Sequence, residues 1–196
     1  MEDNLKTIFE ASYQDPNDAR TSLETKGFKF DTELSSPDTK VFVDAQGNPQ
    51  IAYRGSHRVE DAITDIKLGL GYDTQRHKDA RDIAKQVETK YGKAANAYGT
   101  SLGGNLAEQS GVSGNVYTFN KATGIKDMFK TIPKTQFDYR NDKDLVSLPS
   151  LFQKGNKKIT IGSTKNQNVL SAHSISSFDL SRKKTIQSIN PLAKFA

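Results

Sequence analysis

The spacing of apolar residues changes along the chain from a helical to a strand-like period, and this change predicts where helices and strands lie. Near the N-terminus, apolar side chains recur every three or four positions in residues 4–13, and the proline-containing segment 15–18 then interrupts the pattern. We expect one helix before this break and a second short helix over residues 18–26. Both helices are expected to belong to an outer layer of the fold.

Short apolar runs bounded by turn residues follow, and they have the composition of β-strands. The runs 40–43 and 50–53 are joined by the turn-rich connection 44–49 and predict a β-hairpin. Further strands are expected at residues 94–98, 115–119, 135–140, 158–161 and 168–170. The strand 94–98 is assigned from its context, because few of its residues are β-branched.

Helical segments separate these strands. A polar helix is expected over residues 75–90 and a final helical turn within 174–180. Residues 59–70 carry an apolar stripe at helical spacing, which fits either an ordinary surface helix or a mobile flap over a site. Alternation of strands and helices with short loops predicts an α/β fold, with a mostly parallel central sheet flanked by helices.

The length and composition of the chain limit its organisation. With 196 residues, of which 34% are hydrophobic, the chain can build one domain with a substantial core. We therefore expect a single domain over residues 1–180, in which 1–38 form the outer helical layer and 39–180 form the core. A basic C-terminal tail is expected at residues 181–196.

The same composition disfavours several classes of protein. The mean hydropathy is -0.68, no long apolar run occurs, and the acidic N-terminus lacks the apolar core of a signal peptide. We expect a soluble protein without a transmembrane segment, either cytoplasmic or exported by a route that needs no signal peptide. The chain contains no cysteine, which excludes disulfides, thiolate metal ligands and a cysteine nucleophile.

The net charge of +5 and the isoelectric point near 9.2 favour contact with anionic surfaces. The basic residues are scattered among 23 acidic ones, and no stacking or phosphate-binding motif accompanies them, so no nucleic-acid partner is expected. Two alternatives stay open for this charge: peripheral contact with an anionic membrane, and a basic face that is simply solvated.

A candidate nucleophile lies where the strand before residue 100 turns sharply into a helix. Ser101 is flanked by Gly99 on one side and by Gly103 and Gly104 on the other, which is the G-x-S-x-G pattern of a nucleophile elbow. Glycines are needed there because larger side chains would collide around a strained serine backbone. The plain alternative is a flexible turn of glycine and serine.

An activated serine needs a base to accept its proton and an acid to orient that base. Asp144 and His173 follow Ser101 in the chain order Ser, Asp, His that is expected of α/β-hydrolases. Asp142 is the alternative acid, and Asp144 is preferred because apolar residues follow it. His57 is the alternative base, whereas His77 lies on a polar helix and is expected to be exposed to solvent.

Four separated motifs resemble those of the class 3 lipase family, the branch of the α/β-hydrolase fold that is similar to fungal lipases. Residues 52–56 resemble the arginine-glycine-serine strand of its oxyanion site, and 61–66 resemble the helix that follows. Residues 99–104 resemble its elbow, and 141–149 resemble the acid loop. Two positions depart from the family pattern: Thr100 stands where a histidine is usual, and residues 120–124 lack the usual proline.

The resemblance implies a compact α/β-hydrolase fold and a role for each matching residue. Ser101 would be the nucleophile, His173 the base and Asp144 the acid that orients it. The backbone amides of Ser56 and Leu102 would form the oxyanion hole, with the Ser56 hydroxyl as a further donor. No metal or organic cofactor would be needed.

The resemblance also implies a function, a serine hydrolase that cleaves carboxylic esters through an acyl-enzyme. Lipid esters are the favoured substrate, as in a lipase or a phospholipase A, and small soluble esters are the alternative. A different class of function stays open, a catalytically weak lipase-fold protein that acts as a membrane-binding or structural component.

Overall fold

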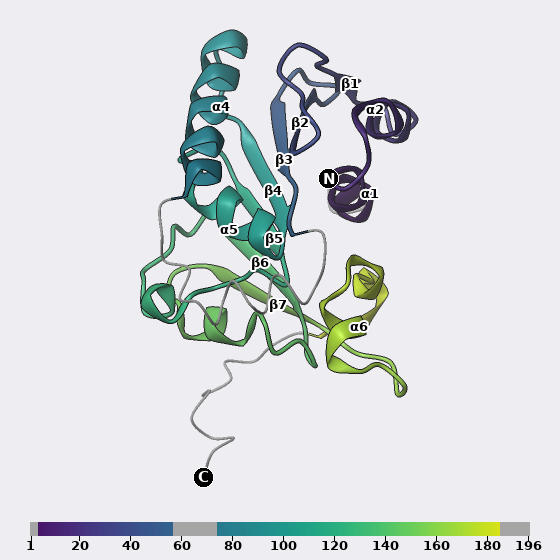
Figure 1. The fold of residues 1–196 in the computed structure, drawn as a ribbon, viewed down its shortest axis with the longest axis vertical. Helices are drawn as coiled ribbons and strands as arrows, with labels where there is room; N and C mark the ends of the chain where they lie inside the picture. Colours follow the sequence, from purple (N-terminus) through teal and green to yellow (C-terminus); the bar gives the residue numbers. More distant parts are fainter. Residues whose placement is uncertain (1–3, 57–73, 185–196) are drawn as a thin grey trace.

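A computed structural model describes residues 4–56 and 74–184 of the chain. These residues form one sheet whose strands lie in sequence order from β1 to β8 (Figure 1). The strands are β1 (Lys29–Phe30), β2 (Thr39–Val43), β3 (Pro49–Tyr53), β4 (Asn96–Thr100), β5 (Val116–Phe119), β6 (Gln136–Asn141), β7 (Lys157–Ile161) and β8 (Lys183–Lys184).

The strands of the central part of the sheet are parallel. Each neighbouring pair from β3 to β7 is parallel, whereas β1, β2 and β3 pair antiparallel at one edge and β8 pairs antiparallel with β7 at the other. The α/β class with a mostly parallel sheet is therefore confirmed, as is the predicted hairpin of β2 and β3. Because the central strands are parallel, their carboxyl ends meet at one edge of the sheet.

Helices cover both faces of this sheet (Figure 1). The helices α1 (Leu5–Ala11) and α2 (Pro16–Glu24) pack on one face, and α4 (Gln75–Tyr91) and α5 (Leu102–Gln109) pack on the other. The predicted break between the first two helices is present, and Asp15 caps the start of α2 there. Its side chain accepts hydrogen bonds from the amides of Asn17 and Asp18.

The period of two in the strands divides the core between these layers. In β2, Phe42 packs toward α1 while Val41 packs toward α4. In β4, Tyr98 likewise packs on the face covered by α1, and Ala97 packs on the face covered by α4. The strand that was assigned only from its context is thus buried along its whole length.

Several elements differ from the sequence prediction near the C-terminus. Residues 168–170 are not a strand, because Asn168 and Ser171 form a capping box that starts the short helix α6 (Val169–His173). The helical turn expected within 174–180 is present as the 3-10 turn η4 (Ile175–Ser177), and η5 (Leu180–Arg182) follows it. Lys183 and Lys184 join the sheet as β8, so the sheet extends into the segment expected to be a tail.

An unexpected cation lies in the layer between the sheet and the first helices. Lys40 in β2 is fully buried, and its Nζ donates a hydrogen bond to the Pro37 carbonyl at 2.8 Å. Burial, together with the positive charge of the nearby Arg54, lowers the pKa of Lys40 to about 8. In the unfolded chain the same group would titrate near its ordinary value, about two units higher.

We expect Lys40→Met to raise the free energy of unfolding at pH 7 by roughly 1–3 kcal/mol, because the wild-type fold must bury a protonated amine there. Between pH 8 and 10.5 the unfolded chain binds more protons at this site than the folded chain, so the stability of the wild type rises with pH. Urea unfolding of both proteins across this range should show the difference between their free energies of unfolding becoming smaller as the pH rises. A difference in free energy of unfolding that is independent of pH would contradict the burial of a charged Lys40.

Candidate functional site

Ser101 lies at the sharp turn between β4 and α5. Its backbone has φ 52° and ψ -124°, a conformation that non-glycine residues rarely adopt. A Cβ atom built on Gly103 would lie 2.3 Å from the carbonyl oxygen of Tyr53, and one on Gly99 would lie 2.1 Å from the Gly103 carbonyl oxygen. The predicted elbow is therefore a close contact between three backbone segments, which only glycines permit.

The structure brings the three residues predicted to act together into one chain of hydrogen bonds. His173 Nε2 lies 2.9 Å from Ser101 Oγ, and His173 Nδ1 lies 2.9 Å from Asp144 Oδ1. All three side chains are nearly inaccessible to solvent. They come from segments that follow β4, β6 and β7, at the edge of the sheet where the parallel strands end.

Asp144, and not Asp142, is the carboxylate that faces the histidine. Its side chain accepts hydrogen bonds from the amides of Val146 and Ser147, both at 3.1 Å. Arg140 in β6 donates to the Asp144 carbonyl at 2.5 Å. Burial lowers the pKa of this guanidinium, and the nearby Asp144 carboxylate opposes the change. Asp142 instead pairs with Lys184 and Ser163.

Asn120 is a further residue of the site, and sequence reasoning did not identify it. It follows β5 with φ 47°, in the left-handed region that asparagine tolerates better than most residues. Its side-chain amide donates to the carbonyls of Ala172 at 2.8 Å and His173 at 3.1 Å, and its Oδ1 accepts from the Asn141 amide. Asn120 thus ties the segment that carries the histidine to the ends of β5 and β6.

The two predicted oxyanion-hole residues lie on the backbones that meet at the elbow. Leu102 is the first residue of α5, where a backbone amide has no acceptor within its own helix. Ser56 follows the end of β3, and its Oγ is buried without a hydrogen-bond partner among the residues that the structure describes. A buried hydroxyl without a partner is uncommon, and it is consistent with a donor that awaits a bound oxygen.

A buried ion cluster holds the elbow helix against the sheet. Lys121 Nζ donates to Glu108 of α5, to Asp138 of β6 at 2.9 Å and to Gln153 at 2.8 Å. Burial alone would lower the pKa of Lys121, but Asp138 and Glu108 raise it above its ordinary value. The lysine therefore stays charged, and removal of one partner would leave an uncompensated charge in the core.

His77 was expected to be exposed, and this expectation is wrong. The ring is buried, with Nδ1 2.7 Å from Thr74 Oγ1 and Nε2 2.8 Å from Asn105 Oδ1. His77 continues the buried stripe of Ala80 and Ala84 at helical spacing along α4, a signal that was present in the sequence. The alternative base His57 and the expected helix at 59–70 lie outside the described residues.

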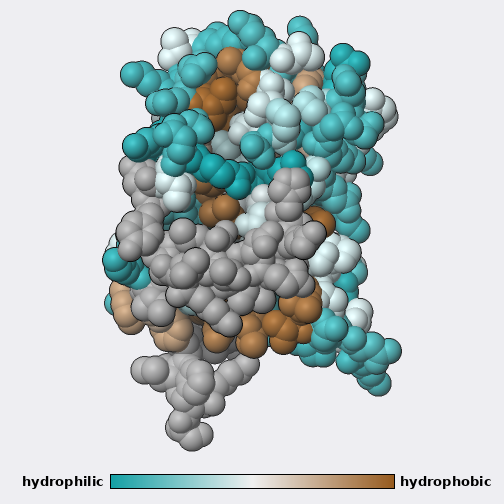
Figure 2. Space-filling view, in the orientation of Figure 1, coloured by the Kyte–Doolittle hydropathy of each residue, from teal (hydrophilic) through white to brown (hydrophobic). Residues whose placement is uncertain are grey.

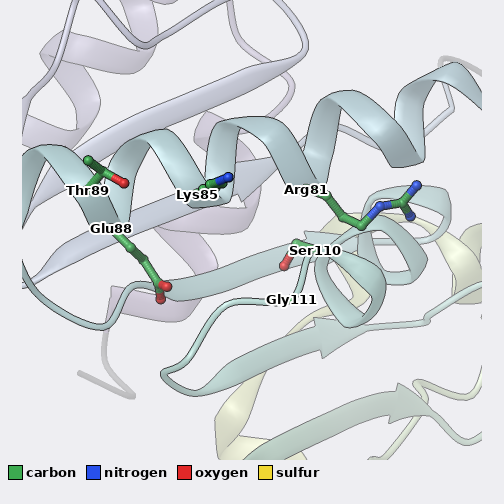
Figure 3. Close-up of a pocket in the computed structure, with 6 residues that line it drawn as sticks. All are labelled: Arg81, Lys85, Glu88, Thr89, Ser110 and Gly111. Carbon is green, nitrogen blue, oxygen red and sulfur yellow. The ribbon is translucent and has the colours of Figure 1, made fainter.

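A separate open pocket of about 400 Å³ lies at the far end of α5 from Ser101 (Figure 3). It is lined by Arg81, Lys85, Glu88, Thr89, Ser110 and Gly111. The Glu88 carboxylate accepts hydrogen bonds there from the backbone amides of Ala95 and Ser113. In the described part of the chain, no group of three or more histidine and acidic side chains is arranged to hold a metal.

We expect Asn120→Ala to lower the free energy of unfolding by roughly 2–4 kcal/mol. The substitution removes three buried hydrogen bonds and places alanine in the left-handed region. Asn120→Gly loses the same bonds but tolerates that backbone conformation, so it should be less destabilised by roughly 1 kcal/mol. Chemical denaturation of the two variants measures the difference, and equal losses would argue against a left-handed Asn120.

One family model matches most of the chain. The family model of the Tle-like phospholipase domain, described as phospholipase-like, matches residues 3–147, a span that includes Ser101 and Asp144. A solved fungal lipase–inhibitor complex, described as a model for interfacial activation in lipases, is 17% identical over 82% of this chain and 77% of that chain, with a TM-score of 0.49. No curated protein sequence matches the chain. Because the family model matches most of its length, the chain belongs to the Tle-like phospholipase domain family.

Proposed function

We propose that this protein hydrolyses carboxylic ester bonds of lipids with Ser101 as its nucleophile. The observation that carries the proposal is the unbroken chain of hydrogen bonds from Asp144 through His173 to Ser101, at the corner of a strained elbow. Membership of a phospholipase-like family is consistent with the proposal and favours phospholipids among the lipid esters.

The first half of the reaction forms an acyl-enzyme. Ser101 Oγ attacks the acyl carbonyl carbon while His173 Nε2 accepts the hydroxyl proton, and the Asp144 carboxylate stabilises the imidazolium that results. The carbonyl oxygen becomes an oxyanion that the amides of Ser56 and Leu102 stabilise. The bond to the leaving alcohol then breaks, and this alcohol takes the proton from His173.

The second half of the reaction regenerates the enzyme. His173 accepts a proton from water, and the resulting hydroxide attacks the carbonyl carbon of the acyl-enzyme. The bond to Ser101 Oγ breaks, the serine recovers its proton from His173, and the fatty acid is released. Asn120 and Arg140 support both halves because they hold the backbones of His173 and Asp144.

The surface around the loops that carry the acid and the base favours a lipid substrate. Leu145 and Leu148 follow Asp144, Val169 and Leu170 precede His173, and all four are exposed apolar side chains. The two loops are joined, because Lys143 Nζ donates to carbonyls of residues 164 and 167. Figure 2 shows brown, hydrophobic atoms along the lower end of the face in view. No described helix is long and apolar enough to cross a membrane.

We expect Ser101→Ala to reduce ester hydrolysis by about a million-fold, the usual cost of losing such a nucleophile. A fluorophosphonate probe should label the wild type and leave this variant unlabelled. Ser110→Ala is the matched control, because Ser110 is also buried and its hydroxyl donates to the Ala107 carbonyl at the other end of α5. A wild type that neither reacts with the probe nor turns over esters would favour the catalytically weak membrane-binding alternative.

We expect the double variant Leu145→Ser, Leu170→Ser to bind phospholipid vesicles about tenfold more weakly, since each leucine would lose part of its transfer energy into the bilayer. Co-sedimentation with vesicles of phosphatidylcholine and phosphatidylglycerol measures this binding. Phe129→Ser is the control, since Phe129 is exposed but lies on neither loop. Equal binding of the double variant and the wild type would remove these side chains from the docking surface.

A further inference from the structure

Tyr13 makes a contact with the elbow that the mechanism above does not use. Tyr13 lies in the turn after α1, where its amide bonds to the Glu10 carbonyl at 3.0 Å. Its hydroxyl lies 2.6 Å from Thr100 Oγ1, in the residue immediately before the nucleophile. The turn after α1 therefore contacts the last residue of β4, directly before Ser101.

The same hydroxyl lies against Gly55. A Cβ atom built on Gly55 would lie only 2.2 Å from Tyr13 Oη and 2.6 Å from the carbonyl oxygen of Thr100. The phenol oxygen thus lies against the Gly55 backbone and the Thr100 side chain, at the point where the two backbones approach each other. One of these backbones continues into Ser56, and the other continues through Ser101 into Leu102.

Arg54, the residue before Gly55, has its backbone bonded to two other segments. The Arg54 amide donates to the Asp38 carbonyl at 3.0 Å, and Arg76 of α4 donates to the Arg54 carbonyl at 2.7 Å. These two contacts fix where the backbone leaves β3. The next residue, Gly55, lies against Tyr13, so the phenol contacts the backbone immediately before Ser56.

Tyr13 is suited to hydrogen bonding and not to proton transfer at neutral pH. Burial raises the pKa of its phenol above the ordinary value, while hydrogen bonds with the Thr100 side chain and the Gly55 amide oppose the rise. The hydroxyl therefore stays protonated under physiological conditions. It can accept from one backbone and bond to the other side chain at the same time.

We propose that Tyr13 is a positioning residue that sets the spacing of the oxyanion hole, by fastening the strand end that leads to Ser56 to the elbow that leads to Leu102. This inference rests on the proposed function. Oxyanion stabilisation depends on donors that are already placed where the charge develops, and small displacements of such donors reduce the rate strongly. Thr100 has a specific role in this arrangement, as the partner that the phenol holds.

A merely structural role for Tyr13 would give a different result from a positioning role. A structural brace would lower stability and leave the kinetics of the folded fraction unchanged. A positioning residue changes the binding of the tetrahedral species while substrate binding stays nearly constant, so kcat falls and KM does not. An alkyl boronic acid, which forms a tetrahedral adduct with the serine, reports the same effect as an inhibition constant.

The test compares Tyr13→Phe with the wild type on a soluble ester. We expect kcat to fall about tenfold to a hundredfold, KM to change less than twofold, and the boronate inhibition constant to rise in proportion to the fall in kcat. Tyr98→Phe is the matched control, because it removes a buried phenol that bonds to Gln50 at 2.7 Å, toward the opposite end of the strands. This control should lose similar stability and keep its kinetics.

A second pair of variants protects the test against misfolding of Tyr13→Phe. Thr100→Val removes the hydroxyl that bonds to the phenol, and Thr100→Ser keeps it. We expect the valine variant to share the defect in kcat and the serine variant to recover most of the loss. Kinetics within twofold of the wild type in both Tyr13→Phe and Thr100→Val would overturn the inference. Failure of the wild type itself to react with a fluorophosphonate would instead overturn the proposed function.

Discussion

The close approach of three backbone segments at the elbow is the constraint on which the rest of this structure depends. The start of α5 lies so near the end of β3 that a Cβ atom on Gly103 would meet the Tyr53 carbonyl at 2.3 Å. Such contact requires parallel strands whose carboxyl ends lie side by side, and it requires a helix that begins immediately after Ser101. In return, the contact brings the backbone that leads to Ser56 beside the first amide of α5, which is the geometry an oxyanion hole needs.

Polar groups buried around this contact hold it in place, and each has specific partners. Asn120 bonds to the His173 backbone, Arg140 bonds to the Asp144 backbone, and Tyr13 bonds to the Thr100 side chain and lies against Gly55. The charged side chain of Lys121 is matched by two carboxylates and one amide. Because unpaired buried polar groups are costly, these bonds specify one arrangement of the loops and disfavour alternatives. Among the described residues, the hydroxyl of Ser56 is buried without such a partner, and Ser56 is the residue proposed to donate to the oxyanion.

The polar interior of the site contrasts with the apolar surface beside it. Leucines and a valine are exposed on the two loops that carry Asp144 and His173, and those loops are joined through Lys143. Contact with a lipid surface would therefore bear directly on the segments that hold Asp144 and His173. In the same loop, Asp142 pairs with Lys184 of β8, so the edge of the sheet also reaches this surface.

The sequence by itself determined the α/β class, the elbow at Ser101 and the order of Ser101, Asp144 and His173, because these depend on local periodicity and short motifs. The capping box at Asn168 was also a local signal, although the strand predicted there proved to be a helix. The tertiary structure showed that the preferred Asp144, and not Asp142, faces the histidine, that His77 and Lys40 are buried, and that Asn120 and Tyr13 bond to segments of the site. The physical reason is the distance along the chain: Tyr13 and Thr100 are 87 residues apart, and Asn120 and His173 are 53 apart. Hydrogen bonds between such residues exist only after the sheet has brought its strand ends together, and no local pattern encodes them.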